Sequence, residues 1–150
     1  MAKAPRTIRT ILPTYQRDRR QWRRDILENV RKAASKAGVE YDRENQLEVV
    51  ILLYLKRGKR LAIHDVDNRL KDILDALQGR FGNSRTVGDD YRLIANDNQI
   101  CRVLIEKQPT PKRFSSEATD AGGRLLIRPY KRYGWPLQVT KDNALLKRRK

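Results

Sequence analysis

One almost unbroken apolar run, from Leu47 to Leu55, limits the folds that this chain can adopt. Its sequence is Leu-Glu-Val-Val-Ile-Leu-Leu-Tyr-Leu, and β-branched and aromatic residues of this kind favour strands. A strand with apolar side chains on both of its sides must be covered on both faces, which is typical of a central strand in a packed sheet. We therefore expect this segment at the centre of a β-sheet.

Two helices and further strands are predicted around this central strand. Apolar residues recur at helical spacing from about Arg17 to Ala37, and again from about Asp67 to Arg80. Short β-branched or alternating segments predict strands over residues 6–12, 100–106 and 125–130. We expect Cys101, in the second of these, to be a buried packing residue. The order of elements predicts an α+β fold with two main helices packed on a small mixed β-sheet.

The length of the chain, 150 residues, suits one domain, and the 39% of hydrophobic residues suffice for a core. We expect this domain over residues 1–131, followed by a basic and poorly ordered C-terminal tail over residues 132–150. No apolar segment approaches the roughly 20 residues that cross a bilayer, and the N-terminus lacks the apolar run of a signal peptide. We therefore expect a soluble, cytoplasmic protein without a membrane partner.

The charge of the chain points to a polyanionic partner. There are 34 Lys and Arg residues against 18 Asp and Glu residues, and a net charge of +16 is typical of proteins that bind nucleic acid. Residues 1–36 carry 11 basic and 3 acidic side chains and residues 107–150 carry 12 and 3, whereas residues 37–106 carry 11 and 12. Carboxylates repel nucleic acid, so their concentration in the middle of the chain needs an explanation. The candidate DNA-binding residues are Arg19, Arg20, Arg23, Arg24, Lys56, Arg57, Lys59 and Arg60.

An acidic pair lies where an extended segment leads into the second predicted helix. In extended backbone, residues two apart project to the same side, so the carboxylates of Asp65 and Asp67 could bind one cation. This requires Asp65 to be non-helical and would place Asp67 at the helix N-cap. Lys71, four residues later, falls on the same flank of the helix as Asp67. A third carboxylate would come from the following loop, which offers Asp89, Asp90 and Asp97.

These side chains suit phosphodiester hydrolysis. Mg²⁺ prefers oxygen ligands and is usually held by one or two carboxylates together with substrate phosphate, and Mn²⁺ can substitute for it. A lysine beside the phosphate offsets the charge that grows in the transition state. With one cysteine and one histidine, the chain cannot form a Cys/His zinc site. The structural alternative is a capped helix in which Lys71 forms exposed ion pairs with Asp67 and Asp75.

Three linked motifs resemble the RusA family of Holliday junction resolvases. They match the family patterns Asp-x-Asp-Asn-x-x-Lys, (apolar)-Asp-Ala-Leu and Asp-Asp-x-Gln-(Val/Ile), in that order. In this chain they are Asp65-Val66-Asp67-Asn68 with Lys71, Leu74-Asp75-Ala76-Leu77, and Ile94-Ala95-Asn96-Asp97-Asn98-Gln99-Ile100. The resemblance spans about residues 45–130, and Gly122-Gly123-Arg124-Leu125 is a weaker match.

The resemblance implies a RusA-like fold and a Mg²⁺-dependent homodimer that nicks two opposing strands of a four-way DNA junction in recombination and repair. It implies that Asp65, Asp67 and Asp97 bind the metal and that Lys71 is also catalytic. A two-fold dimer suits a symmetric junction, which presents two equivalent cleavage points.

The chain departs from the family pattern at three places. Asn96 stands where the family has the first Asp of its pair, and Leu12-Pro13-Thr14-Tyr15 is a reduced form of an early Pro-Pro-Ser segment. The loop from Gly79 to Ile94 is long, so Asp89 or Asp90 could replace Asp97 as the third ligand. Two other functions stay open: a non-catalytic nucleic-acid-binding protein, and a nuclease that acts on other branched DNA.

Overall fold

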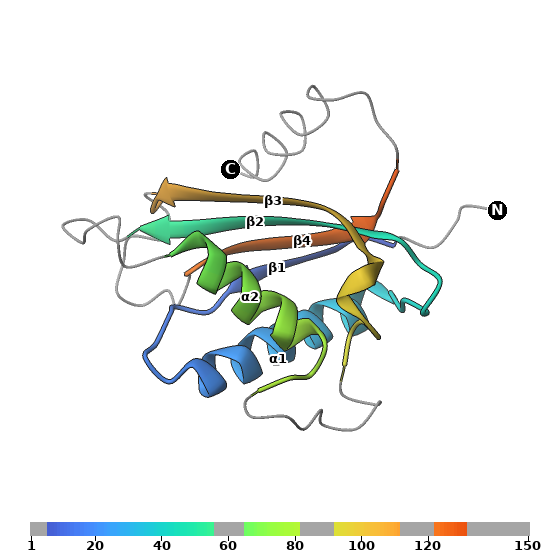
Figure 1. Cartoon of the computed structure of the whole chain (residues 1–150), viewed down its shortest axis with the longest axis horizontal. Helices are drawn as coiled ribbons and strands as arrows, with labels where there is room; N and C mark the ends of the chain where they lie inside the picture. The colour runs from blue at the N-terminus through green and yellow to red at the C-terminus, as the bar shows by residue number, and fades with distance from the viewer. Residues whose placement is uncertain (1–5, 56–64, 82–91, 112–121, 132–150) are drawn as a thin grey trace.

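The computed structural model describes residues 6–55, 65–81, 92–111 and 122–131 (Figure 1). These residues form a four-stranded mixed sheet with two helices on one of its faces, which confirms the predicted α+β class. The elements are β1 (Ile8–Leu12), α1 (Arg19–Ala37), β2 (Leu47–Leu55), α2 (Val66–Leu77), the 3-10 helix η3 (Asp97–Gln99), β3 (Ile100–Pro109) and β4 (Gly123–Pro129). The predicted tail over residues 132–150 lies outside the described residues.

The strand order is β1-β4-β2-β3, so that β2 lies inside the sheet as predicted. It pairs antiparallel with β4 and parallel with β3, and β4 pairs antiparallel with β1. Every residue of β2 except the last is buried, and helices α1 and α2 lie over one face of the sheet. The apolar run therefore forms an inner strand of the sheet, as its sequence pattern predicted.

Alternation along β2 divides the core into two layers. Leu47, Val49, Ile51 and Leu53 face the helices, where they join the main hydrophobic cluster with Trp22 and Ile73. Glu48, Val50, Leu52 and Tyr54 alternate with them, and the last three form a second cluster with Leu126. No helix of the described residues lies on this second face (Figure 1).

Helix α1 begins and ends at residues suited to those positions. The Asp18 carboxylate accepts hydrogen bonds from the backbone amides of Arg20 and Gln21, which caps the N-terminus. The helix ends at Gly38, whose φ of 65° lies in the left-handed region that favours glycine. Trp22 is buried on the inner side of the helix, and its indole N–H donates to the carbonyl of Pro13 at 3.0 Å.

Two glycines allow close contact between chain segments at the start of β4. A Cβ atom at Gly123 would overlap the carbonyl oxygen of Leu52, and one at Gly122 would overlap that of Pro13. Both neighbours are backbone atoms, which cannot move aside as a flexible side chain can. The Gly-Gly pair is therefore a packing requirement of this fold.

The loop before β2 is fixed to the sheet by Tyr41. Its hydroxyl donates to the carbonyl oxygens of Arg6 and Ile127, so that it joins this loop to β4 and to the segment just before β1. Burial raises the pKa of Tyr41 well above its usual range. In the described part of the chain, no helix is both long enough and apolar enough to cross a membrane.

The prediction that Cys101 is buried is wrong. Cys101 is exposed, and Val103 is 36% exposed. The reason is that β3 is the outermost strand of the sheet, and none of its residues is buried. Alternating apolar residues show which side chains share a face, but they do not show whether that face is covered.

Candidate functional site

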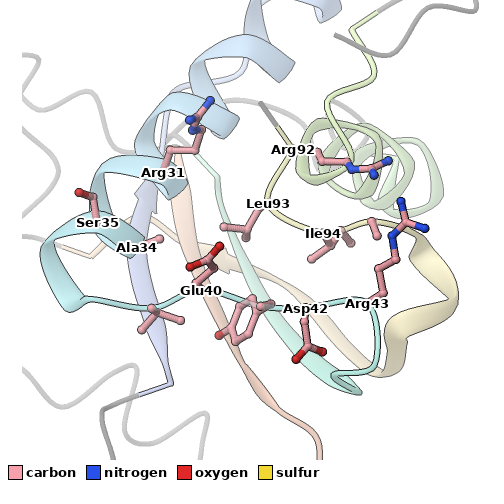
Figure 2. Close-up of a pocket in the computed structure, with 12 residues that line it drawn as sticks. Arg31, Ala34, Ser35, Glu40, Asp42, Arg43, Arg92, Leu93 and Ile94 are labelled. Carbon is pink, nitrogen blue, oxygen red and sulfur yellow. The ribbon is translucent and has the colours of Figure 1, made fainter. Parts of the chain in front are cut away.

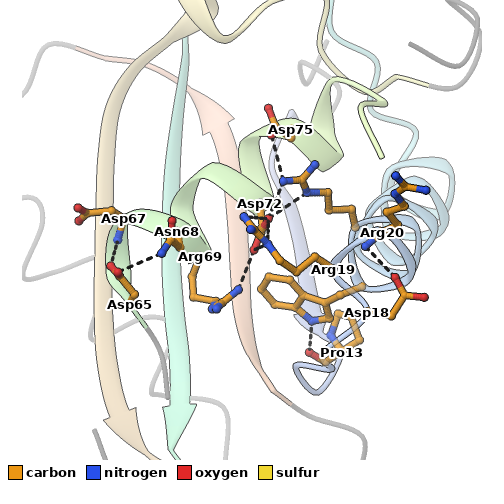
Figure 3. A network of polar contacts seen from close by, with 12 residues as sticks. Pro13, Asp18, Arg19, Arg20, Asp65, Asp67, Asn68, Arg69, Asp72 and Asp75 are labelled. Carbon is orange, nitrogen blue, oxygen red and sulfur yellow. Dashed lines mark hydrogen bonds and ion pairs between the residues drawn. The ribbon is translucent and has the colours of Figure 1, made fainter. Parts of the chain in front are cut away.

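Asp65 is extended and caps helix α2. Its φ and ψ are −75° and 115°, and its carboxylate accepts hydrogen bonds from the Asp67 amide at 3.2 Å and the Asn68 side chain at 3.0 Å (Figure 3). The requirement that Asp65 be non-helical is met. The expected N-cap position of Asp67 is wrong: the helix begins at Val66, one residue earlier than predicted, because Asp65 itself supplies the capping oxygen.

The start of α2 forms an exposed polar surface, which we call the α2 strip: Asp65, Asp67, Asn68 and Lys71. The structural alternative predicts ion pairs between Lys71 and Asp67 or Asp75. Neither pair forms among the described residues, and Asp75 instead contacts Arg23 at 3.3 Å. The Lys71 ammonium and the Asp67 carboxylate therefore stand at the surface one helical turn apart, in reach of the same ligand.

Asp97 lies at the other end of α2. The backbone amides of Leu93 and Ile94 donate to the Leu77 carbonyl, which holds the segment before η3 against the last turn of α2. Helix α2 has 12 residues and so spans about 18 Å, with Asp65 at its start. Figure 1 shows η3 near the end of α2, whereas α2 begins near the arrowheads of β2 and β3.

Within one chain the predicted third ligand is therefore separated from the first two. Among residues 6–55, 65–81, 92–111 and 122–131, no three Asp, Glu, His or Cys side chains gather in a group that could hold a metal ion. The alternative third ligands, Asp89 and Asp90, lie outside the described residues.

Asn96, which departs from the family pattern, is the N-cap of η3, a position that Asp would fill equally well. Its side chain accepts a hydrogen bond from the Asn98 amide at 2.9 Å, and the Gln99 side chain accepts from the amides of Ala95 and Asn96, which completes a capping box. The Gln99 amide group also donates to the carbonyls of Asp42 and Asn45. These bonds fix the 3-10 turn that carries the exposed Asp97 at the start of β3.

A buried ionic cluster joins the two helices. The carboxylate of Asp72 is fully buried and contacts three guanidinium groups, those of Arg19 at 2.9 Å, Arg23 at 2.7 Å and Arg69 at 2.7 Å (Figure 3). Arg69 also stacks on the Tyr15 ring at 3.7 Å. We call this set the Asp72 cluster. The sequence gives little sign of it, because Arg19 and Arg23 come from a helix about fifty residues away from Asp72.

The Asp72 cluster changes the role of two predicted DNA contacts. The Arg23 side chain is only 12% exposed, whereas that of Arg19 is 45% exposed although it binds the same carboxylate. The hydrogen bond to Asp72 raises the pKa of Arg19, so its charge is held firmly. Arg20 and Arg24 are exposed on α1, and Arg24 lies over the Phe81 ring. The other four predicted contacts, Lys56, Arg57, Lys59 and Arg60, lie outside the described residues.

A pocket of about 510 Å³ lies at the Asp97 end of α2 (Figure 2). Its apolar lining includes Val39, Leu93 and Ile94, and it also contains three arginines that were not among the predicted DNA contacts: Arg31, Arg43 and Arg92. The lining also holds the carboxylates of Glu40 and Asp42, so the pocket is of mixed charge, and the segment from Arg92 to Ala95 leads from it directly into η3.

Comparison with known proteins gives no independent assignment. No family model matches the sequence, and no curated protein matches it. The function has to be argued from the α2 strip, from Asp97 and from the charge around them.

Proposed function

We propose that this protein is a Mg²⁺-dependent endonuclease that cuts branched DNA as a homodimer, with the four-way junction as its substrate. The observation that carries the proposal is the α2 strip, where two carboxylates and a lysine stand exposed at one helix start in a chain of net charge +16. For a protein that only coats DNA, exposed carboxylates weaken the electrostatic attraction, since they repel phosphate. The motifs that resemble the RusA family contain the same residues.

The donors of the strip suit Mg²⁺. Asp65 and Asp67 both offer carboxylate oxygens, and proteins usually hold this ion with one or two carboxylates while substrate phosphate and water complete its shell. When bound there, the ion supplies Lewis-acid stabilisation of the phosphate that is cleaved.

Each remaining group of the strip has a role in holding or compensating charge. Asn68 orients the Asp65 carboxylate through its bond at 3.0 Å, so the ligand is fixed before DNA arrives. Lys71 stands where its ammonium can offset negative charge on the phosphate. The exposed Arg20 and Arg24 contact the DNA backbone and position it without selecting sequence.

The separation of Asp97 from the α2 strip suggests that a second copy of the chain completes each metal site. Because Asp97 lies a helix length from Asp65 in its own chain, we assign the third ligand of each site to Asp97 of a second copy. The exposed position of Asp97 on η3 leaves its carboxylate accessible to another chain. Each dimer would then hold two equivalent sites, as two opposing cuts require.

Mixing two inactive variants tests this assignment. Asp67→Asn and Asp97→Asn should each be inactive alone, but a heterodimer has one site with Asp67 from one chain and Asp97 from the other. Random exchange makes half of the dimers mixed, so nicking should return to about a quarter of the wild-type rate. The measurement is gel analysis of an end-labelled synthetic junction after the two proteins have exchanged subunits.

The controls for the mixing experiment separate the other sources of a third ligand. If Asp97 acts within its own chain, both sites of the heterodimer are damaged and the mixture stays inactive. If Asp89 or Asp90 is the third ligand, Asp97→Asn alone keeps its activity. In an equal mixture of either variant with wild-type protein, paired cutting should fall to about a quarter of the wild-type level if subunits exchange, but only to about half if they do not.

The overall proposal is tested by the wild-type protein on four labelled substrates: a four-way junction, a linear duplex, a flap and a fork. We expect Mg²⁺-dependent paired nicks in a four-way junction, no cutting in EDTA, and little cutting of linear duplex DNA of matched sequence. Preferential cutting of flaps or forks would support the proposed nuclease activity but would contradict the four-way junction as its substrate.

The second candidate is a non-catalytic nucleic-acid-binding protein. One observation favours it: Asp65 already serves as the N-cap of α2, which is a sufficient structural reason for an aspartate there. Junction binding without cutting in either Mg²⁺ or Mn²⁺ would establish this alternative.

A further inference from the structure

We infer that the homodimer forms along the outer edge of β3, which pairs antiparallel with β3 of a second copy. The inference rests on the proposed function, because it identifies the surface of the dimer that the nuclease requires. Strand pairing of this kind supplies affinity through backbone hydrogen bonds, and it joins the two sheets into one.

The outer edge of β3 has no partner among the described strands. β3 is the last strand in the order β1-β4-β2-β3, it has ten residues, and none of them is buried. Val103, near its middle, is 36% exposed, although it is a large apolar residue. A long edge with exposed apolar residues is a template for pairing with another chain, and monomeric proteins usually protect such edges.

The sequence of β3 is self-complementary about Leu104. In a two-fold antiparallel pair centred there, Arg102 of each copy faces Glu106 of the other, and Val103 faces Ile105. Opposite charges and apolar pairs at such positions stabilise strand pairing. A centre at Val103 would place Arg102 opposite Leu104, and a centre at Ile105 would place Val103 opposite Lys107. Only the Leu104 centre matches both kinds of pair.

Arg102 is already held on the helix-free face. Its guanidinium contacts the Glu48 carboxylate at 3.3 Å and lies over the Tyr130 ring at 5.2 Å. Glu48 is buried and also contacts Arg128 at 2.7 Å, so that one carboxylate serves two arginines. In the pair centred on Leu104, Glu106 of a second copy would face the Arg102 guanidinium on this same side of the sheet.

The opposite edge of the sheet fits a second copy less well. β1 has five residues, and the carbonyl of Ile11 accepts a hydrogen bond from the Asn29 side chain. A pair centred on Thr10 would place Arg9 opposite Ile11 and would bring no opposite charges together. Ile11 is 39% exposed, nearly the same as Val103, so it offers a matched control.

Antiparallel pairing along β3 has a consequence for the candidate site. It places the start of β3 in one copy beside the end of β3 in the other. Because η3 directly precedes β3, Asp97 of the second copy comes to the end of the sheet where α2 begins (Figure 1). This is the end at which the α2 strip lies.

The test compares Val103→Asp with Ile11→Asp by sedimentation velocity over a range of concentrations. We expect the wild type and Ile11→Asp to be dimers, and Val103→Asp to dissociate at least about 100-fold more readily, because it places two carboxylates against apolar side chains in each dimer. Circular dichroism of both variants shows whether each is folded. A wild-type monomer, or a Val103→Asp dimer as tight as the wild type, would overturn the inference.

A second measurement tests the same surface even if the Val103→Asp variant does not fold. In a Cys101→Ser background, Leu104→Cys faces itself across the two-fold axis at a separation that a disulfide can bridge, so mild oxidation should give a covalent dimer. The same substitution at Ile11 should give none, and the reverse pattern would contradict the β3 surface. Neither readout needs DNA cutting. A β3 dimer that never cuts junctions refutes the nuclease alone, whereas a nuclease without this dimer refutes the surface alone.

Discussion

Replacement of Asp67 by Asn is expected to abolish Mg²⁺-dependent nicking of a four-way junction while junction binding stays intact or becomes tighter. Asn lacks the charge that holds the metal ion, and it no longer repels phosphate. Even partners that only support a metal ligand change activity by about 10- to 100-fold, so loss of a ligand should cost at least about 100-fold. The measurements are single-turnover nicking and gel-shift titration in Ca²⁺ or EDTA.

Asp18→Asn is the matched control for Asp67→Asn. Asp18 is also exposed and also lies at a helix start, where its oxygen caps α1, and Asn retains a capping oxygen. This variant should cut at the wild-type rate. If Asp67→Asn cuts as fast as Asp18→Asn, the α2 strip is not the metal site, and the proposed role of Asp67 is wrong.

Replacement of Asp72 by Asn is expected to lower the free energy of unfolding by about 3–5 kcal/mol, the range measured when one partner of a buried ion pair is removed. Three guanidinium groups share the fully buried Asp72 carboxylate, and two of them, on Arg23 and Arg69, are themselves largely buried. The amide would leave these charges without a counterion. Urea unfolding followed by tryptophan fluorescence measures the change, because Trp22 lies beside the cluster.

The surface pair between Glu28 and Lys32 provides the comparison for Asp72→Asn. It has a similar distance of 2.9 Å, but both of its side chains are well exposed. Glu28→Gln should therefore change the free energy of unfolding by less than about 0.5 kcal/mol. Equal effects of the two substitutions would show that burial of Asp72 does not determine its contribution.

Local sequence patterns predicted the elements of this fold well. The apolar run gave both ends of β2, and helical spacing gave α1 to within two residues of its start. These features depend on residues close together in the chain, which is why spacing and caps reveal them. The exposure of Cys101 depends on the place of β3 in the sheet, which no local pattern records.

In the candidate site, too, features that depend on neighbouring residues were predicted, and features that depend on the packing of distant segments were not. The spacing predicted correctly that Asp65 is non-helical ahead of α2, because a helix cap depends on neighbouring residues, but it did not place Asp67 inside the helix. The position of Asp97 depends on the direction of α2 across the sheet, and this places it a helix length away from Asp65. The Asp72 cluster was not predicted, because it requires knowledge of which side of α1 meets α2.

The glycines at the start of β4 offer a way to recognise relatives by their fold instead of by the residues of the candidate site. At Gly122 and Gly123 any larger residue would collide with main-chain oxygens, whatever the protein binds or cuts. An exposed carboxylate such as Asp65 can be exchanged without a collision in the core, but these two positions stay constrained as long as β4 pairs with β1 and β2 in this way. A search keyed on the Gly-Gly step at the start of an inner strand would therefore find relatives that a search keyed on acidic residues would miss.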